Sequence, residues 1–232
     1  MLITLVIIGV VAALTIPNLM QKYTEQTTVK KLQKFYSNLS NAYNLAMKEN
    51  GPANEWGLTG RDETSANKVY ELLFKPYFKI AKNCGINNMG NCLANVHYKY
   101  LNNGTTANYA TNIAGHNDKY YKIALDDGAA VWWRGNSKSE QPLNINIFYD
   151  VNGVKGPNQW GRDLFDFYIS DKKVFPPGIT SGDYSYSAVS FNNNCKKTAQ
   201  GWGCAAWVVY KGNMDYLHCN GLDWDKNSCK DK

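Results

Sequence analysis

The sequence predicts an α+β fold in which a long N-terminal α-helix packs on a small antiparallel β-sheet head. Three observations support this prediction. Residues 1–21 form an apolar run without a single charge, and residues 22–51 carry apolar side chains at three- and four-residue steps. Residues 52–232 hold short β-rich runs between Gly and Asn turns, together with all six cysteines. The expected parts are thus an anchor helix, a stem helix and a globular head.

The composition excludes two broad classes of protein. The chain has 232 residues, of which 44% are hydrophobic, and this is enough apolar material for a core rather than a disordered chain. The mean hydropathy of −0.45 excludes a protein with many membrane spans. The net charge of +6 is spread unevenly, because the first ionisable side chain is Lys22.

The anchor and the stem are expected to form one helix over residues 1–50, with a bend at Pro17. The segment 1–16 would be about 24 Å long, which is shorter than the helix usually needed to cross a bilayer. A helix end is predicted at Gly51, which precedes Pro52. The apolar stripe of the stem contains Val29, Leu32, Tyr36, Leu39, Tyr43 and Ala46, widened by Phe35 and Met47.

The cysteines fall into three couples that are close in sequence: Cys84 and Cys92, Cys195 and Cys204, and Cys219 and Cys229. The sequence alone does not choose among the pairings, but each couple brackets a short loop, so local disulfides are expected. A zinc site is the competing interpretation, although no couple has CxxC spacing and His218 is the only nearby histidine. Disulfides indicate an oxidising compartment.

The head is expected to contain a short helix over residues 63–80, limited by Pro76, and strands from about residue 96 onward. Residues 120–136 read as a hairpin that turns at Asp126–Asp127–Gly128. Residues 143–153 alternate apolar and polar side chains, and residues 165–170 form a further strand. Such hairpins predict an antiparallel meander with the long helix on one face. The later segment AAWVVY fits a helix or a strand equally well.

The segment DVNGVKGPNQWGRDLFDF, residues 150–167, is the most distinctive motif of the head. Asp150, Asn152 and Asp163 could supply oxygen ligands to Ca²⁺, and glycines would permit a tight wrap. The motif does not follow the EF-hand pattern. The alternative is a turn-dense connection in which Asp and Asn side chains cap backbone groups.

No catalytic motif stands out, so an enzyme is not expected. HExxH, GxSxG, P-loop and GxGxxG patterns are absent from the sequence. The histidines His97, His116 and His218 are isolated, and the paired aspartates 126 and 127 are read as turn residues. Trp132 and Trp133 should face opposite sides of a strand, with one of them in the core. The basic cluster from Lys22 to Lys34 belongs to the stem, so nucleic-acid binding is not expected either.

The segment LITLVIIGVVAALTIPNLMQKY resembles the N-terminal helix of type IV pilins and of type II secretion pseudopilins. The resemblance covers residues 1 to about 50 and includes Gly9 and Pro17. It implies that Val6, Gly9, Leu14 and Pro17 lie in the membrane or filament helix. The leader, cleavage site and glutamate of the family pattern do not precede the match, as if Met1 were an internal methionine of the mature helix. The 150–167 motif and the tail, residues 195–229, also resemble segments of pilin-like proteins, some of which bind calcium in a head loop.

By this resemblance, the chain is expected to be a structural subunit of a type IV pilus or a type II secretion pseudopilus. The implied partners are other subunits, a prepilin peptidase and an assembly platform. The implied location is the bacterial inner membrane, with the head in the periplasm or outside the cell. The alternative from another class is an exported surface- or carbohydrate-binding module with a cleaved apolar leader. No cofactor is expected other than Ca²⁺.

Overall fold

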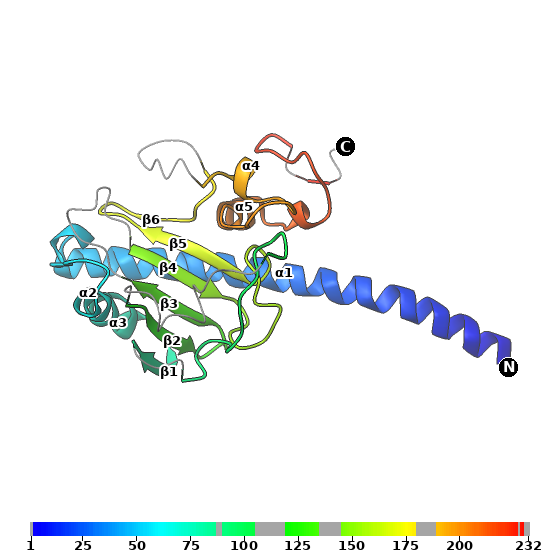
Figure 1. Ribbon diagram of the computed structural model, residues 1–232, viewed down its shortest axis with the longest axis horizontal. Helices are drawn as coiled ribbons and strands as arrows, with labels where there is room; N and C mark the ends of the chain where they lie inside the picture. The colour runs from blue at the N-terminus through cyan, green and yellow to red at the C-terminus, as the bar shows by residue number, and fades with distance from the viewer. Residues whose placement is uncertain are drawn as a thin grey trace.

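The computed structural model describes residues 2–86, 90–104, 119–134, 145–179, 189–226 and 228–229, without the side chains of residues 2–6. A single long helix, α1, runs along one face of a six-stranded antiparallel sheet and extends far beyond it (Figure 1). A smaller helical region near the C-terminus lies beside the same helix. The predicted α+β fold, with a long N-terminal helix on an antiparallel sheet, is confirmed.

Helix α1 spans Leu2–Asn50 and continues through Pro17, so the predicted single helix is confirmed. It ends where the sequence indicates. Gly51 adopts a left-handed φ of 76°, which a residue without a Cβ tolerates best.

The stem half of α1 buries the predicted stripe against the sheet. Leu32, Leu39, Tyr43 and Ala46 are fully buried, and the Tyr43 hydroxyl donates to the carbonyl oxygen of Ser170 at 2.8 Å. One detail differs from the prediction, because Phe35 rather than Tyr36 occupies the centre of the stripe. The Phe35 ring stacks on Tyr149 of the sheet with centroids 4.0 Å apart, whereas Tyr36 is only half-buried.

The region after α1 begins with a 3-10 turn, Ala53–Glu55, and continues with α2, Glu63–Val69. The Asp62 side chain caps α2 by accepting from the backbone N–H of Ser65. A π-helical turn, Tyr70–Phe74, and α3, Lys75–Tyr77, complete the helical stretch. The predicted helix over 63–80 is therefore three residues too long, since Ile80 already begins a strand.

The sheet is an antiparallel meander with strand order β1-β2-β3-β4-β5-β6, as predicted for its later strands. Its strands are β1 Ile80–Gly85, β2 Tyr121–Leu125, β3 Ala130–Arg134, β4 Ile145–Asp150, β5 Leu164–Ile169 and β6 Val174–Phe175. The expectation that strands begin near residue 96 is wrong. Strand β1 was missed because it is irregular: its pairing with β2 shifts register twice, which removes the alternation that identifies strands.

The two faces of the sheet are both buried. Ile145, Ile147 and Tyr149 face the helix, in agreement with their alternation in sequence. Trp132 and Trp133 lie on opposite faces as predicted, but both are buried. The second face is covered by a smaller cluster that includes Leu93, Ala94, Tyr98, Tyr120, Phe148, Trp160 and Leu164.

The C-terminal region consists of α4, Phe191–Asn194, α5, Cys204–Lys211, and a 3-10 turn, Asp215–Leu217. The AAWVVY segment is thus helical. Helix α5 packs beside α1, where the Gln33 side-chain amide donates to the carbonyl oxygen of Val209 at 2.9 Å. The Phe191 and Trp207 rings stack with centroids 4.0 Å apart and join α4 to α5.

All six cysteines form the three local disulfides that the sequence favours: Cys84–Cys92, Cys195–Cys204 and Cys219–Cys229. The competing zinc interpretation is wrong, because no cysteine is left free to bind a metal. Each bridge closes a loop of about ten residues. Cys84 belongs to β1, Cys195 and Cys204 are buried in the main core, and the Cys219–Cys229 bridge closes the half-buried tail.

Candidate functional site

The half of α1 that extends beyond the head is apolar and uncovered. Ile8, Leu14 and Leu19 are 65%, 68% and 68% exposed, and Gly9 has open space around its Cα. Pro17 lies within this half, whereas the side chain of Val6 lies outside the described residues.

Within the described part of the chain, no helix offers an apolar stretch long enough to cross a bilayer. Large apolar surfaces of this kind mark interaction sites. The exposed members are Ile7, Ile8, Val10, Val11, Leu14, Ile16, Leu19, Met20 and Tyr23.

The stem enters the head beside two neighbouring turns of the sheet. The Lys31 ammonium donates to the carbonyl oxygens of Val151, at 3.0 Å, and of Asp127, at 3.3 Å. The turns themselves touch. A Cβ at Gly153, whose φ is 65°, would lie 2.5 Å from the carbonyl oxygen of Gly128. The sequence NG at the end of β4 is therefore required by close packing as well as by turn geometry.

The two aspartates of the 150–163 loop are buried and hydrogen-bonded. Asp150 accepts from the Tyr98 hydroxyl at 2.8 Å and from the backbone N–H groups of Asn152 and Gly153, at 3.1 and 3.0 Å. Asp163 accepts from the backbone N–H groups of Asn158 and Gln159, at 2.8 and 2.6 Å. These bonds close the loop upon itself.

The electrostatics of the loop follow from this burial. Burial, and then the charge of Asp163, raise the pKa of Asp150 well above its usual range. Burial raises the pKa of Asp163 to about 6, although backbone hydrogen bonds oppose the shift. At neutral pH the pair therefore holds a proton more readily than two exposed aspartates do.

The loop brings the three predicted calcium ligands together, but they fit a cation poorly. Calcium takes about six to eight oxygen ligands. The four carboxylate oxygens of Asp150 and Asp163 already accept hydrogen bonds. The side-chain oxygen of Asn152 is buried without a hydrogen-bond partner among the described residues, but it would supply only one of these ligands. In the residues that the structure describes, no three His, Cys, Asp or Glu side chains gather as a metal site. The geometry favours a self-closed loop, and the calcium hypothesis stays a prediction.

A buried acid outside this loop predicts a pH dependence of stability. Burial raises the pKa of Asp166 on β5 to about 8, whereas aspartate in an unfolded chain titrates near ~3.9. The folded form therefore binds the proton of Asp166 more tightly than the unfolded chain does. This proton stabilises the fold fully below about pH 4, and the stabilisation is lost as pH rises through about 8. We expect the free energy of unfolding in urea to fall from about pH 5 to about pH 9.

The variant Asp166→Asn tests this assignment, because it keeps the shape of the side chain and removes the titration. It should reduce the fall between about pH 5 and about pH 8, while Asp225→Asn, at an exposed position, should leave the profile unchanged. A wild-type stability that is constant from pH 5 to about 9 would contradict the raised pKa.

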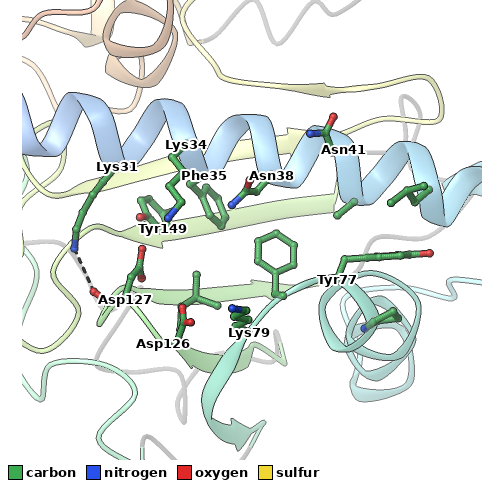
Figure 2. Close-up of a pocket in the computed structure, with 15 residues that line it drawn as sticks. Lys31, Lys34, Phe35, Asn38, Asn41, Tyr77, Lys79, Asp126, Asp127 and Tyr149 are labelled. Atoms are coloured by element: carbon green, nitrogen blue, oxygen red, sulfur yellow. Dashed lines mark hydrogen bonds between the residues drawn. The ribbon is translucent and has the colours of Figure 1, made fainter.

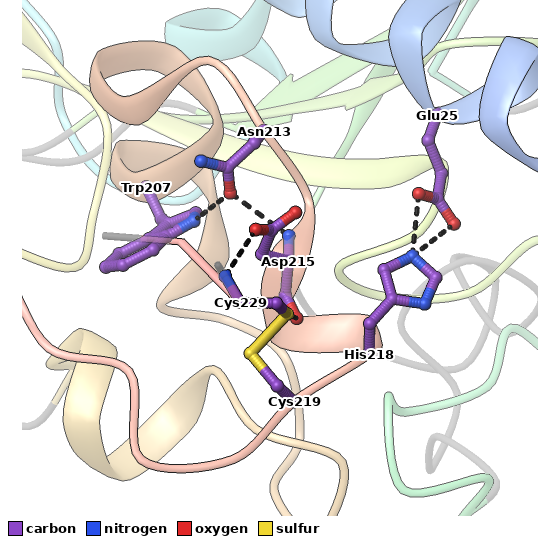
Figure 3. Close-up of a disulfide and its surroundings, with 7 residues drawn as sticks. All are labelled: Glu25, Trp207, Asn213, Asp215, His218, Cys219 and Cys229. Atoms are coloured by element: carbon purple, nitrogen blue, oxygen red, sulfur yellow. Dashed lines mark hydrogen bonds and ion pairs between the residues drawn. A yellow bond between two sulfur atoms is a disulfide. The ribbon is translucent and has the colours of Figure 1, made fainter. Parts of the chain in front are cut away.

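The C-terminal disulfide region is tied to the stem at the point where α1 leaves the head (Figure 3). His218 Nε2 lies 3.0 and 2.8 Å from the two carboxylate oxygens of Glu25. The Asp215 carboxylate accepts from the backbone N–H of Cys229 at 2.7 Å. The Tyr216 hydroxyl donates to the carbonyl oxygen of Gly161 at 2.6 Å and so reaches the 150–163 loop. The stem, the 150–163 loop and the C-terminal tail are thus joined by hydrogen bonds at the end of the head from which the apolar half of α1 extends.

A groove of about 600 Å³ lies between the stem and the β2–β3 turn (Figure 2). Lys34, Asn38 and Asn41 line its stem side, while Lys79 and Asp126 line the other. Among the described residues that line the groove there is no serine, cysteine or histidine, so these residues form no Ser–His or Cys–His pair. The aspartates of the turn act as predicted, since Asp127 accepts from the backbone N–H of Ala129 at 3.1 Å.

The histidines do not form a cluster in the described residues. His218 contacts Glu25, and His116 lies outside the described residues. The absence of an enzymatic activity stays a prediction, because nothing in the structure tests it.

Sequence reasoning missed two polar contacts, one buried in the head and one at the surface of the stem. The Lys122 ammonium on β2 donates to the carbonyl oxygens of Ile86 and, at 2.9 Å, of Tyr120, and burial lowers its pKa to about 8. The Glu25–His218 contact was also missed. Its partners are 193 positions apart, and no local pattern connects them.

Comparison with known proteins identifies a family but no function. A model of a family of unknown function, DUF6613, matches residues 18–175. The chain belongs to this family. The DUF6613 match begins in α1 just after Pro17 and ends with β6, so it covers the stem and the whole sheet. No curated protein and no solved structure matches the chain.

Proposed function

We propose that the chain is a structural subunit of a filament of the type IV pilus or type II secretion pseudopilus kind, assembled through the apolar half of α1. The observation that carries the proposal is the exposure of this half on nearly every side of the helix. A helix that is apolar all round is stable only when lipid or other helices surround it. Copies of the same helix meet this need in the core of a filament.

The energetics favour such a bundle. Burying one Leu, Ile or Val side chain contributes about 1.5–3 kcal/mol, and the exposed half carries several of them. The head leaves this apolar surface uncovered, because its described residues bury α1 only from about residue 25 onward. If each apolar half contacts different patches on its neighbours, the contacts do not close into a ring and an open helical filament results.

The arrangement of the head supports the same proposal. The stem lies across an antiparallel meander, as the resemblance to pilins implies, and a disulfide-bonded tail lies beside it (Figure 1). In this proposal the apolar half is held in the bacterial inner membrane before assembly. A prepilin peptidase and an assembly platform act on it there, and the head lies in the periplasm or outside the cell.

The alternative, an exported binding module, receives less support from the structure. An aromatic content of 13% would suit such a module, but five of the seven tryptophans are buried in the two cores: Trp56, Trp132, Trp133, Trp160 and Trp207. These rings therefore pack the head and cannot serve as an exposed platform for a sugar.

Cell fractionation tests the filament proposal. We expect the protein to partition between the membrane fraction and the fraction of filaments sheared from the cell surface or from a strain that overproduces it. Mass spectrometry should find the segment of residues 6–16 retained in both fractions. Recovery of the protein as a free periplasmic monomer without this segment would support the binding module and contradict the proposal.

A further inference from the structure

The side of α1 opposite the stripe that packs on the sheet carries lysines and no acidic residue. Lys22, Lys30, Lys34 and Lys48 are all exposed. At 100° per residue they fall within an arc of about 120°, centred roughly opposite the stripe that packs on the sheet. They extend over about 40 Å of helix. We refer to these four lysines as the lysine face.

No acidic side chain of the helix balances this face. The two glutamates of α1 are engaged elsewhere, since Glu25 contacts His218 and Glu49 accepts from the Tyr77 hydroxyl at 2.9 Å. The fifth lysine of the stem, Lys31, is turned toward the sheet and binds backbone carbonyls there. Lys34 lies at the edge of this face and also lines the groove that contains Asp126 and Asp127, so Lys22, Lys30 and Lys48 are the members whose charge is most available to a partner.

We infer that the lysine face binds the anionic surface of a lipid bilayer. It is continuous with the uncovered apolar half of α1, and Tyr23, 65% exposed, stands at the boundary between the two. Apolar side chains followed by lysines and an interfacial aromatic ring are typical of helices that lie at the boundary of an anionic membrane. In this arrangement the apolar half enters the bilayer, and the stem lies along the lipid headgroups with the head above it.

The apolar half distinguishes a lipid surface from other anionic partners. A nucleic acid or an acidic protein would neutralise the lysines but would leave the neighbouring apolar side chains in water. A bilayer with anionic lipids satisfies both surfaces at once, because each lysine near such a surface adds attraction that salt screens. This inference goes beyond the filament proposal and does not require filaments to form.

Vesicle flotation tests the inference with the full chain, diluted from detergent into preformed vesicles. The measured quantity is the ratio of partition into phosphatidylcholine vesicles with about one quarter phosphatidylglycerol to partition into phosphatidylcholine alone. We expect the wild-type ratio to be large and to fall as salt rises from about 0.1 to about 0.5 M. The variant K22Q/K30Q/K34Q/K48Q should lower the ratio by about a hundredfold or more, at roughly fivefold per lysine.

The matched control is K99Q/K172Q/K196Q/K197Q, which removes the same charge from exposed positions on the head. It should keep the wild-type ratio, and the three native disulfides should form in all three proteins. Equal binding to both kinds of vesicle, or equal loss in both variants, would overturn the inference. An unchanged ratio in the lysine-face variant would also overturn the inference. If this variant kept the wild-type ratio but no longer formed filaments, the lysine face would instead bind a second copy of the chain.

Discussion

Leu14→Asp is expected to abolish recovery of the protein in sheared filaments while the head stays folded. Leu14 is 68% exposed in the single chain, so the change removes no contact within it. In a bundle of apolar helices the aspartate would be surrounded by hydrocarbon, at a cost of about 2.5–3.5 kcal/mol for each copy. Because every copy carries the charge, we expect filament yield to fall by at least about a hundredfold, measured by shearing and immunoblotting.

The control for this variant is Thr198→Asp, which places the same charge at an exposed position beside the Cys195–Cys204 bridge. It should assemble like the wild type. Both proteins should show the same urea unfolding curve. Normal filament yield from Leu14→Asp would mean that the apolar half lies outside the subunit contacts.

Phe35→Ala is expected to cause the largest loss of stability. The ring is 3% exposed, stacks on Tyr149 and lies 5.4 Å from the Phe167 ring, so it joins the stem to β4 and β5. Removing a buried aromatic ring leaves a cavity that costs about 3–5 kcal/mol. Urea unfolding followed by tryptophan fluorescence measures this change, because Trp133 lies in the same core.

Tyr23→Ala is the matched control, since the same helix carries this aromatic ring but leaves it 65% exposed. Its free energy of unfolding should stay within about 0.5 kcal/mol of the wild type. A small effect of Phe35→Ala, comparable to that of Tyr23→Ala, would show that the stem does not pack on the sheet as described.

The sequence predicts those elements whose pattern is local. The α1 stripe repeats at the helical period over several turns, and Gly51 stops it. The hairpin at Asp126–Gly128 and the alternation in β4 are also local signals, and the structure contains both. The disulfides could be predicted because each couple is separated by only eight to ten positions.

The parts that escaped prediction depend on contacts between distant segments. Strand β1 is defined by its pairing with β2, which lies across some forty residues of chain, and its own side chains do not alternate. AAWVVY becomes a helix because α5 finds an apolar partner in α1. The loop motif identified Asp150 and Asp163, but only the structure shows that N–H groups and Tyr98 occupy their oxygens.

The most direct test of the account is to ask whether the apolar halves of neighbouring chains touch. All six native cysteines are in disulfides, so Leu14→Cys adds the single free thiol of the chain. Treating sheared filaments with a short bismaleimide should then convert this variant to covalent dimers, whereas Thr198→Cys on the head should stay monomeric. Filaments in which Leu14→Cys remains monomeric, or a Leu14→Cys protein found only as a free monomer, would contradict assembly through α1.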